Sequence, residues 1–413
     1  MTEQWRRGGR GLALALVLAL TAVACGDSAD DDAAVDEPAV TETSVDGAGT
    51  DRDADAGDGE TTGDGDDEAA AGTCESVDGV SLQLQWVTQA QFAGYFAAIE
   101  EGFYDDFCLD VTILEGGVDI VPQQQLASGL ADFAVAWVPK ALVSREEGLD
   151  IVNVAQVFER SGTLQVAFAD AGITGPEDFA GHKIGNWGFG NEFELLAGAR
   201  QAGLEPGQDF ELVQQSFDML ALIAGDIDAA QAMTYNEYAQ VLETVNPVTG
   251  ELFQPEDLVV IDWNDVGTAM LQDAIWADGE RLASDPVYQD ITTRFIAGSL
   301  QGWAHCRDEL QACAEIVLAN SPILGRSHQE WMMNEINALI WPSSGQVGVM
   351  QQELWDQTID VATTEGVLSG PPEDGAYTTE YAEDAVSLLE DRGVDVVGTD
   401  FATAEVTLAE GGE

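Results

Sequence analysis

Val80-Ser-Leu-Gln-Leu-Gln-Trp86 alternates apolar with polar side chains, which is the period of a β-strand. In the residues that follow, Phe92 and Phe96 recur at helical spacing. Thr88 and Gln91 form a capping-box pattern, which predicts that the helix begins at Thr88. The turn between strand and helix carries aromatic and amide side chains, and such turns bind ligands in open α/β sheets. We therefore expect the first part of a ligand site here.

The same alternation continues along the chain. Strands are predicted at 109–114, 132–136, 151–157, 182–186, 210–213, 227–233 and 258–261, with helices between them. Asn191 with Glu194, and Thr234 with Glu237, predict the caps of two of these helices. This order implies parallel sheets with right-handed crossovers. The roughly 340 residues available for folding exceed one core, so two lobes are expected. A strand at 274–277 returns to the first half, which predicts one lobe at 76–160 and 267–413 and the other at 161–266.

The N-terminal residues have the pattern of a secretory signal peptide, predicted over 1–24. Arg6, Arg7 and Arg10 precede an apolar run from 12 to 20 that is too short to span a bilayer. Small residues before Cys25 resemble a bacterial lipobox, which would make Cys25 a lipidated first residue of the mature protein. The alternative is an ordinary signal peptide with an incidental cysteine. Residues 25–75 are predicted to include a disordered acidic tether, because they hold few large apolar side chains.

The chain is strongly acidic, with 14 Lys and Arg against 76 Asp and Glu and a formal net charge of −62. This balance argues against nucleic acid as a partner, because such binding requires neutralised phosphates. It argues equally against docking on an anionic lipid surface. A surface this rich in carboxylates repels itself in the absence of salt.

The remaining cysteines suggest disulfides. Cys74 and Cys108 each precede one of two adjacent predicted strands, so their side chains are expected to meet. Cys306 and Cys313 would lie roughly 10 Å apart on one helix and can bond only if the helix breaks near 308–309. Four free thiols are the alternative. No cysteine or histidine spacing suits zinc, so neither a metal nor a cofactor is expected.

An aromatic side chain appears at the end of strand after strand, where a helix then begins. Trp86, Trp137, Trp187, Phe217 and Tyr235 hold such positions. If the two lobes face each other, these turns line one cleft, with aromatic faces and free helix N–H groups. Such a cleft suits a flat, polar-edged ring. Each aromatic alone is as well explained by core packing.

Several motifs resemble a known family. They are Gln91-Phe-Ala-Gly-Tyr95, Glu101-Gly-Phe-Tyr104, Leu109-Asp-Val-Thr-Ile113, Gln124-Gln-Leu-Ala-Ser-Gly-Leu-Ala-Asp132 and Gly188-Phe-Gly-Asn-Glu192. Together they are similar to the SsuA/thiamine-pyrimidine-synthase-like substrate-binding proteins of ABC importers, over most of residues 79–366. Cys108 stands where the family usually has glycine.

The resemblance implies an α/β, two-lobed type II periplasmic-binding-protein fold with a hinged central cleft. It implies a monomer outside the cytoplasm, held to the membrane by its lipid anchor, that delivers a small heteroaromatic ligand to an ABC permease and its ATPase. A thiamine pyrimidine precursor or riboflavin is the expected ligand. The implied contacts are Trp86, Gln91, Phe92, Tyr95, Trp137, Gln156, Trp187, Phe189, Asn191, Glu192, Phe217, Tyr235, Asn236 and Asp265.

Two alternatives remain open. A sulfonate such as taurine would need a convergent cation, for which Lys140, Arg160 and Lys183 are the nearby candidates. The superfamily also includes a thiamine pyrimidine synthase, an enzyme that consumes its own histidine. Lys140 stands at that position here, and the cysteine cluster of the synthase is missing, so a non-enzymatic binding protein is preferred.

The acidic surface generates a first prediction. Raising NaCl from low to molar concentration should raise the unfolding temperature, because the salt screens repulsion between carboxylates. Differential scanning calorimetry across that range checks this. An unfolding temperature that does not rise would contradict the inference that the surface carboxylates repel one another.

Overall fold

The computed structural model describes residues 74–412, which belong to one compact unit. The predicted signal peptide, Cys25 and nearly all of the tether therefore lie outside the described residues. Among the residues described, no helix has the length and hydropathy needed to cross a membrane.

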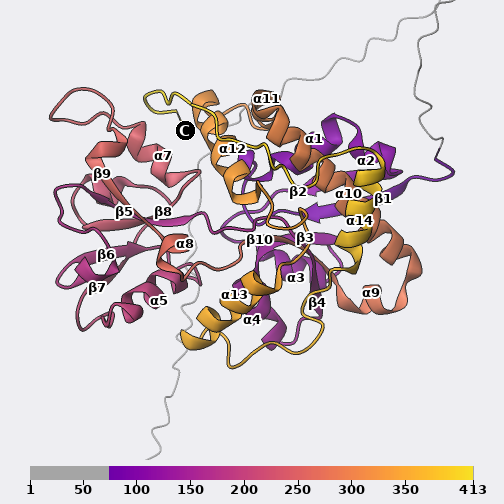
Figure 1. Cartoon of the computed structure of the whole chain (residues 1–413), viewed down its shortest axis with the longest axis horizontal. Helices are drawn as coiled ribbons and strands as arrows, with labels where there is room; N and C mark the ends of the chain where they lie inside the picture. Colours follow the sequence, from indigo (N-terminus) through magenta and orange to yellow (C-terminus); the bar gives the residue numbers. More distant parts are fainter. Residues whose placement is uncertain (1–73, 413) are drawn as a thin grey trace, which may run out of the picture. The chain divides into compact units, whose positions relative to one another are not determined.

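Two five-stranded sheets organise the chain (Figure 1). In the first sheet the order is β2-β1-β3-β10-β4, and β10 runs antiparallel to both of its neighbours while β1 runs parallel to β2 and β3. Its strands are β1 (Asp78–Gln83), β2 (Leu109–Leu114), β3 (Phe133–Trp137), β4 (Ile151–Gln156) and β10 (Asp273–Asp278). We call the elements before β5 and from β10 onward lobe 1.

The second sheet has the order β7-β6-β8-β5-β9, and β5 runs antiparallel to β8 and β9. Its strands are β5 (Thr163–Phe168), β6 (Lys183–Asn186), β7 (Glu211–Gln214), β8 (Ala229–Met233) and β9 (Leu258–Asp262). We call this part, from β5 to α8, lobe 2. Both sheets are mixed, whereas the alternation of strands and helices predicted parallel ones. Strand β5 follows β4 directly, and β10 follows β9 through only the four-residue helix α8 (Trp263–Val266). Neither connection is the long helical crossover that makes a neighbouring strand parallel.

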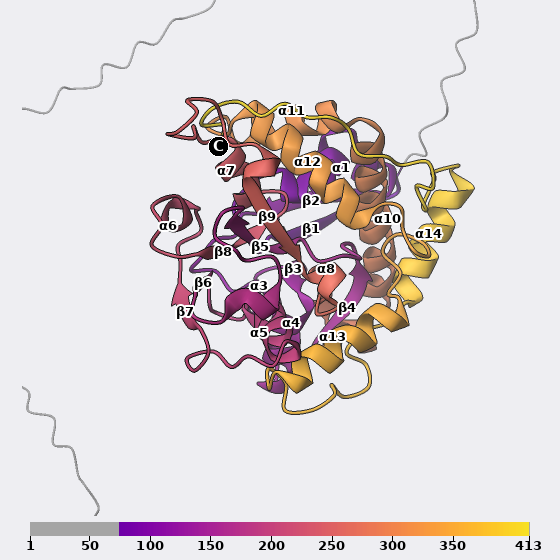
Figure 2. The same ribbon diagram turned by 60° about the vertical axis from the view of Figure 1, so that its left-hand side comes forward.

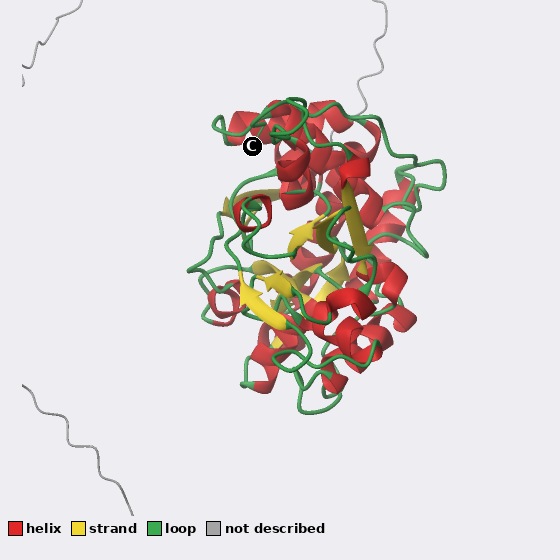
Figure 3. Cartoon of the chain, turned by 90° about the vertical axis from the view of Figure 1, so that its left-hand side faces the viewer, coloured by secondary structure: helices red, strands yellow, loops and turns green. Residues whose placement is uncertain are grey.

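Helices cover the sheets on both sides (Figure 3). The helices of lobe 1 are α1 (Ala93–Glu100), α2 (Phe103–Asp106), α3 (Pro122–Ala127), α4 (Val138–Glu146), α9 (Gly279–Ser284), α10 (Pro286–Asp308), α11 (Leu310–Asn320), α12 (Arg326–Ile340), α13 (Gln352–Thr364) and α14 (Glu380–Asp391). The helices of lobe 2 are α5 (Phe193–Gln201), α6 (Leu220–Ile223), α7 (Glu237–Leu242) and α8 (Trp263–Val266). Short 3-10 turns lie at η1 (Ala90–Phe92), η2 (Pro176–Phe179) and η3 (Pro255–Asp257).

Two glycines let α1 pack directly on α10. A Cβ atom added to Gly302 would lie 2.0 Å from the carbonyl oxygen of Gly94, and one added to Gly94 would lie 2.3 Å from the Trp303 ring. The Trp303 ring then packs edge-on against Tyr95, with ring centroids 5.7 Å apart. This contact anchors the helical layer of lobe 1 to the first strand–helix unit.

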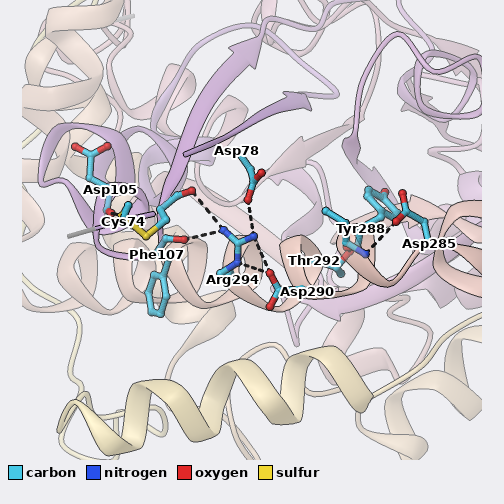
Figure 4. A network of polar contacts seen from close by, with 11 residues as sticks. Cys74, Asp78, Asp105, Phe107, Asp285, Tyr288, Asp290, Thr292 and Arg294 are labelled. Carbon is cyan, nitrogen blue, oxygen red and sulfur yellow. Dashed lines mark hydrogen bonds and ion pairs between the residues drawn. A yellow bond between two sulfur atoms is a disulfide. The ribbon is translucent and has the colours of Figure 1, made fainter. Parts of the chain in front are cut away.

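A partly buried arginine joins α10 to the beginning of the first sheet (Figure 4). Arg294 donates to the Phe107 carbonyl at 2.9 Å and forms ion pairs with Asp78 and Asp290, each at 2.7 Å. A disulfide between Cys74 and Cys108 closes the same edge, as the cysteine positions suggested. The start of β1, the turn before β2 and the long helix are therefore held together.

The second disulfide joins Cys306 to Cys313. It is possible because α10 ends at Asp308 and α11 begins at Leu310, so the helix breaks where the spacing required it.

The predicted capping boxes are wrong in three places. Thr88 does not cap a helix, since the chain passes through η1 and α1 begins at Ala93 without a side-chain cap. Neither α5 nor α7 has a side-chain cap at its N-terminus. Glu194, read from sequence as part of a cap, instead accepts a hydrogen bond from the Met270 N–H at 2.6 Å. A side chain expected from local sequence to cap its own helix can therefore bond to a more distant part of the fold instead.

The close approach of α1 and α10 generates a stability prediction. Gly302→Ala should lower the free energy of unfolding by about 1–3 kcal/mol, because the new methyl group forces the helices apart. Chemical denaturation measures this. Gly79→Ala is the matched control, since a Cβ there meets nothing within 4 Å, and it should cost far less. Equal costs for the two variants would contradict the packing argument.

Candidate ligand-binding site

The first residue of β10 places a carboxylate at the boundary between the lobes. Asp273 pairs in register with Trp137, the last residue of β3. Because β10 is antiparallel, its beginning lies at the edge where β3 ends. That edge is where the turn after β1 and the N-terminus of α4 also meet, so side chains from distant parts of the sequence converge on Asp273.

Three side chains donate hydrogen bonds to Asp273, which is only 2% exposed. Trp137 Nε1 donates at 2.7 Å, Gln91 Nε2 donates at 3.0 Å, and Gln85 Nε2 donates to the same oxygen as Trp137. Burial raises the pKa of the Asp273 carboxyl to about 7, although these hydrogen bonds and the charge of Lys140 act in the opposite direction. The carboxyl can therefore change its protonation state near neutral pH.

Lys140 links the two lobes beside this carboxylate. Its Nζ donates to Asn191 Oδ1 at 2.7 Å and lies 4.7 Å from the centroid of the Trp137 ring. Burial lowers the pKa of Lys140 to about 8, while the carboxylates of Glu192 and Asp273 favour the charged form. Polar groups of α4 and of the loop after β6 therefore already touch across the boundary.

An aromatic series crosses the boundary at a second point. Trp86 of lobe 1 lies 5.0 Å from the ring of Phe217 in lobe 2, measured between centroids. Phe217 in turn stacks on Trp187 at 5.8 Å with 24° between the ring planes. Trp187 is 3% exposed, and its Nε1 has no hydrogen-bond partner among the described residues. A buried donor without an acceptor is costly, so a ligand acceptor would stabilise this position.

The two chain crossings between the lobes are bonded to each other. Gln272 donates to Ser161 Oγ at 3.0 Å and to Thr163 Oγ1 at 2.7 Å, and it accepts from the Gly162 N–H at 2.8 Å. Glu194 of α5 contacts both crossings, through Ser161 Oγ at 3.0 Å and the Met270 N–H.

Burial raises the pKa of the Glu194 carboxyl to about 8, although these hydrogen bonds act to lower it. The crossings have the arrangement of a hinge, since both connections between the lobes pass through one small polar cluster.

The two lobes pack closely against each other in this structure, with little space between them. A cavity lined by Trp137, Asn191, Glu194, Met270 and Gln272, among others, has a volume of about 10 Å³, room for about one water molecule. Trp187 and Tyr235 of lobe 2 also belong to the same buried cluster as Phe92 and Tyr95 of lobe 1. A ring-sized ligand at this point requires the lobes to separate or the aromatic side chains to move.

The sequence-predicted residues fall into three groups. Those at the lobe boundary are Trp86, Gln91, Trp137, Trp187, Asn191, Glu192 and Phe217. Buried packing or hinge positions are held by Phe92, Tyr95, Gln156 and Tyr235. The others lie elsewhere: Phe189 is 81% exposed, Asp265 is exposed in α8, and Asn236 is bonded to His328 of α12 at 2.9 Å.

The list omitted the residues at the centre of this arrangement. Asp273, Lys140, Gln85, Glu194 and Gln272 carry most of its polar contacts. One signal for Asp273 was available, since it directly precedes the strand predicted to return to lobe 1. A charged residue at the start of a buried strand needs partners, and the strand ends around it supply them.

Comparisons with known proteins agree with this architecture. The family model described as NMT1/THI5 like matches residues 89–309. The formylaminopyrimidine-binding protein of Halalkalibacterium halodurans is 24% identical over 77% of this chain and 92% of its own length. The riboflavin-binding protein RibY of Chloroflexus aurantiacus is 24% identical over 73% of this chain and 85% of its own.

Among solved structures, the periplasmic aliphatic sulphonate binding protein SsuA of Escherichia coli superimposes with a TM-score of 0.51. The match covers 82% of this chain and 96% of that one at 16% identity, so it shows a shared fold. The predicted two-lobed periplasmic-binding fold is confirmed.

The buried hinge carboxyl generates a pH prediction. The pKa of Glu194 is raised from its usual value of 4.5 to about 8 on folding, so the folded protein binds the extra proton between these values. Its contribution to stability is therefore present at low pH and is lost as pH rises toward 8. Glu194→Gln should flatten the fall in unfolding free energy between pH 5 and 8 by about 1–3 kcal/mol.

Urea denaturation at a series of pH values measures this difference. Glu280→Gln is the control, because Glu280 is exposed in the first turn of α9 and should leave the profile unchanged. A Glu194→Gln profile parallel to that of the unsubstituted protein would contradict the assignment.

Proposed function

Since the chain belongs to the NMT1/THI5-like family, we propose that it is the substrate-binding component of an ABC importer. In this proposal it binds a small heteroaromatic ligand, a thiamine pyrimidine precursor or riboflavin, between its lobes. The relatives named for formylaminopyrimidine and riboflavin support this ligand class. The observation that carries the proposal is the presence of both aromatic ring faces and a buried carboxylate at the boundary between the lobes.

The chemistry of that boundary fits a polar-edged ring. Trp86, Trp187 and Phe217 offer aromatic faces for stacking. Asp273 accepts hydrogen bonds and is suited to amino groups or ring N–H groups of a heterocycle, while Trp187 Nε1 is a donor for a ring nitrogen or carbonyl. A ligand would replace one of the internal donors that Asp273 now uses, all of which belong to lobe 1.

The proposed mechanism is closure around the ligand. We place lobe 1 at 76–160 and 267–413 and lobe 2 at 161–266, with the hinge at the two crossings. Ligand contacts to both lobes favour the closed state over the open one, which is what shifts the equilibrium. The importer would recognise the closed form, with the permease and its ATPase as partners. The signal sequence and Cys25 would hold the protein at the outer face of the membrane through a lipid.

An anion such as a sulfonate fits the boundary less well. Lys140 lies there, but the carboxylates of Glu192 and Asp273 offset its positive charge. Arg160 is engaged with backbone carbonyls, including Pro342 O at 2.8 Å, and Lys183 is exposed. The synthase alternative is also less well supported, since all four cysteines among the described residues form disulfides.

Isothermal titration against hydroxymethylpyrimidine, formylaminopyrimidine, riboflavin and taurine tests the ligand class. We expect one of the three heteroaromatic ligands to bind at a ratio of one per chain. Tight binding of taurine alone would contradict the proposal and favour the sulfonate reading.

A tryptophan substitution tests the site itself. Trp187→Leu should weaken binding of the identified ligand by about 10-fold or more, because a stacking face and a donor are lost together. Trp355→Leu is the matched control: Trp355 is similarly buried, at 6%, but lies in α13 within a different core cluster. Equal affinities of the two variants would show that the ligand binds elsewhere.

A further inference from the structure

The last described residues of the chain cross from lobe 1 to lobe 2. The segment is first bonded to lobe 1, where the Val347 N–H donates to the Val396 carbonyl at 3.0 Å. It then reaches α7 of lobe 2, where the Gly411 N–H donates to the Glu243 carbonyl at 3.1 Å. The label C lies beside α7 in both Figure 1 and Figure 2. We call residues 402–412 the strap, and we propose that the strap is a latch that holds lobe 2 closed on lobe 1 in the absence of ligand.

The strap follows α12 on its way between the lobes. The Ala404 N–H donates to Asn334 Oδ1 at 2.7 Å, and the Ala409 N–H donates to Ser327 Oγ at 3.2 Å. Both acceptors belong to α12. Leu408 packs on the other side, against a core cluster whose buried residues all belong to lobe 2. Within a few residues the strap therefore contacts both lobes.

The end of the strap fits closely between the two lobes. Gly412 is buried, and a Cβ atom added to it would lie 2.9 Å from Ser327 Oγ of α12 and 2.5 Å from the Glu243 carboxylate of α7. A Cβ atom added to Gly325, directly before α12, would overlap the carbonyl oxygen of Gly412. This fit exists only while α12 and α7 keep their present separation, so it depends on the closed arrangement of the lobes.

Helix α12 is bonded directly to lobe 2 beside the strap. Nδ1 of His328 lies 3.0 Å from Glu243 Oε2, and Nε2 of the same ring lies 2.9 Å from Asn236 Oδ1. Trp331 Nε1 donates to the Thr234 carbonyl at 3.0 Å. His328 and Glu243 are only 1% and 3% exposed. Separation of α12 from α7 would remove the partners of these buried groups, so the contacts favour the closed state.

The strap and the His328 contact lie far from the hinge. The last turn of α12 is at one of the crossings, because the Glu159 N–H donates to the Leu339 carbonyl at 3.0 Å. His328 lies roughly 16 Å from Leu339 along the same helix. A rotation of about 10° at the crossing would displace lobe 2 by roughly 3 Å at this distance, which is enough to break a hydrogen bond. Opening of the lobes therefore requires release of the strap.

A latch of this kind lowers the free energy of the closed state before any ligand binds. The apparent affinity for a ligand held between the lobes rises with the fraction of the protein that is closed. This effect on affinity rests on the proposed function, whereas the latch itself does not.

Deuterium exchange of the tryptophan indole N–H groups, measured by nuclear magnetic resonance on the full-length protein without ligand, tests the latch. Deletion of residues 402–413 removes the strap, and Gly325→Ala displaces it with one methyl group. Trp331 Nε1 bonds across the lobes and Trp187 Nε1 is buried between them, so both should exchange about 5-fold or more faster in each variant. The Trp276 indole donates to a backbone carbonyl within lobe 1 at 3.0 Å and should keep its rate.

Gly370→Ala is the matched control, since a Cβ atom there meets nothing within 4 Å, and it should leave all three exchange rates unchanged. Unchanged exchange of Trp187 in both variants would overturn the inference. Equal acceleration of Trp276 would also overturn it, because that result indicates a general loss of stability. If the deletion variant fails to fold, Gly325→Ala still decides the outcome.

Ligand titration of the same variants separates the latch from the proposed function. Each variant should bind the identified heteroaromatic ligand about 3-fold or more weakly than the unsubstituted protein. Unchanged exchange in a protein that binds such a ligand would reject the latch alone. Faster exchange in a protein that binds no heteroaromatic ligand would support the latch and reject the proposed function alone.

Discussion

The buried carboxylate of Asp273 is the interaction on which the lobe 1 face of the boundary depends. Its three donors come from the turn after β1, from the helical turn that follows it, and from the end of β3. These segments are distant from Asp273 in sequence, and the antiparallel entry of β10 is what brings them together. An unpaired carboxylate at this depth would be strongly unfavourable, so the strand ends must supply donors.

Hydrogen bonds among buried polar groups also explain how the two lobes are joined. At the crossings, Glu194 and Gln272 satisfy the backbone and hydroxyl groups of the two connecting segments. These bonds stay within one small cluster around the crossings. The aromatic contacts between Trp86, Phe217 and Trp187 lie between the facing turns instead. Opening would thus expose the rings while the hinge cluster keeps its own partners, which is the behaviour expected of a hinged binding protein.

Sequence patterns predicted the architecture because hydrophobic periodicity and cysteine position are local signals. The break between α10 and α11 lies where a bond between Cys306 and Cys313 requires it. The return of the chain to the first sheet was predicted from one apolar strand near 274–277. Helix caps were predicted poorly, because side chains such as Glu194 have better partners in the other crossing than at their own helix end.

The candidate site was predicted only in part, because its aromatic residues leave a local signal in the sequence and its buried carboxylate does not. Aromatic residues at strand ends are visible in a sequence: Trp86, Trp187 and Phe217 meet at the boundary, and Trp137 bonds to Asp273 there. Asp273 is one acidic residue among 76 Asp and Glu, and composition cannot distinguish it from the others. Only the tertiary fold shows that it is buried and that it faces Lys140.

The most direct test is a nuclear magnetic resonance titration of the protein labelled with ¹⁵N in its tryptophan indoles. If a heterocycle binds between the lobes, the Nε1–H signals of Trp187 and Trp137 should shift together as ligand is added, because one gains an acceptor and the other loses its bond to Asp273. A ligand that binds at a ratio of one per chain while both signals stay unchanged would contradict the account.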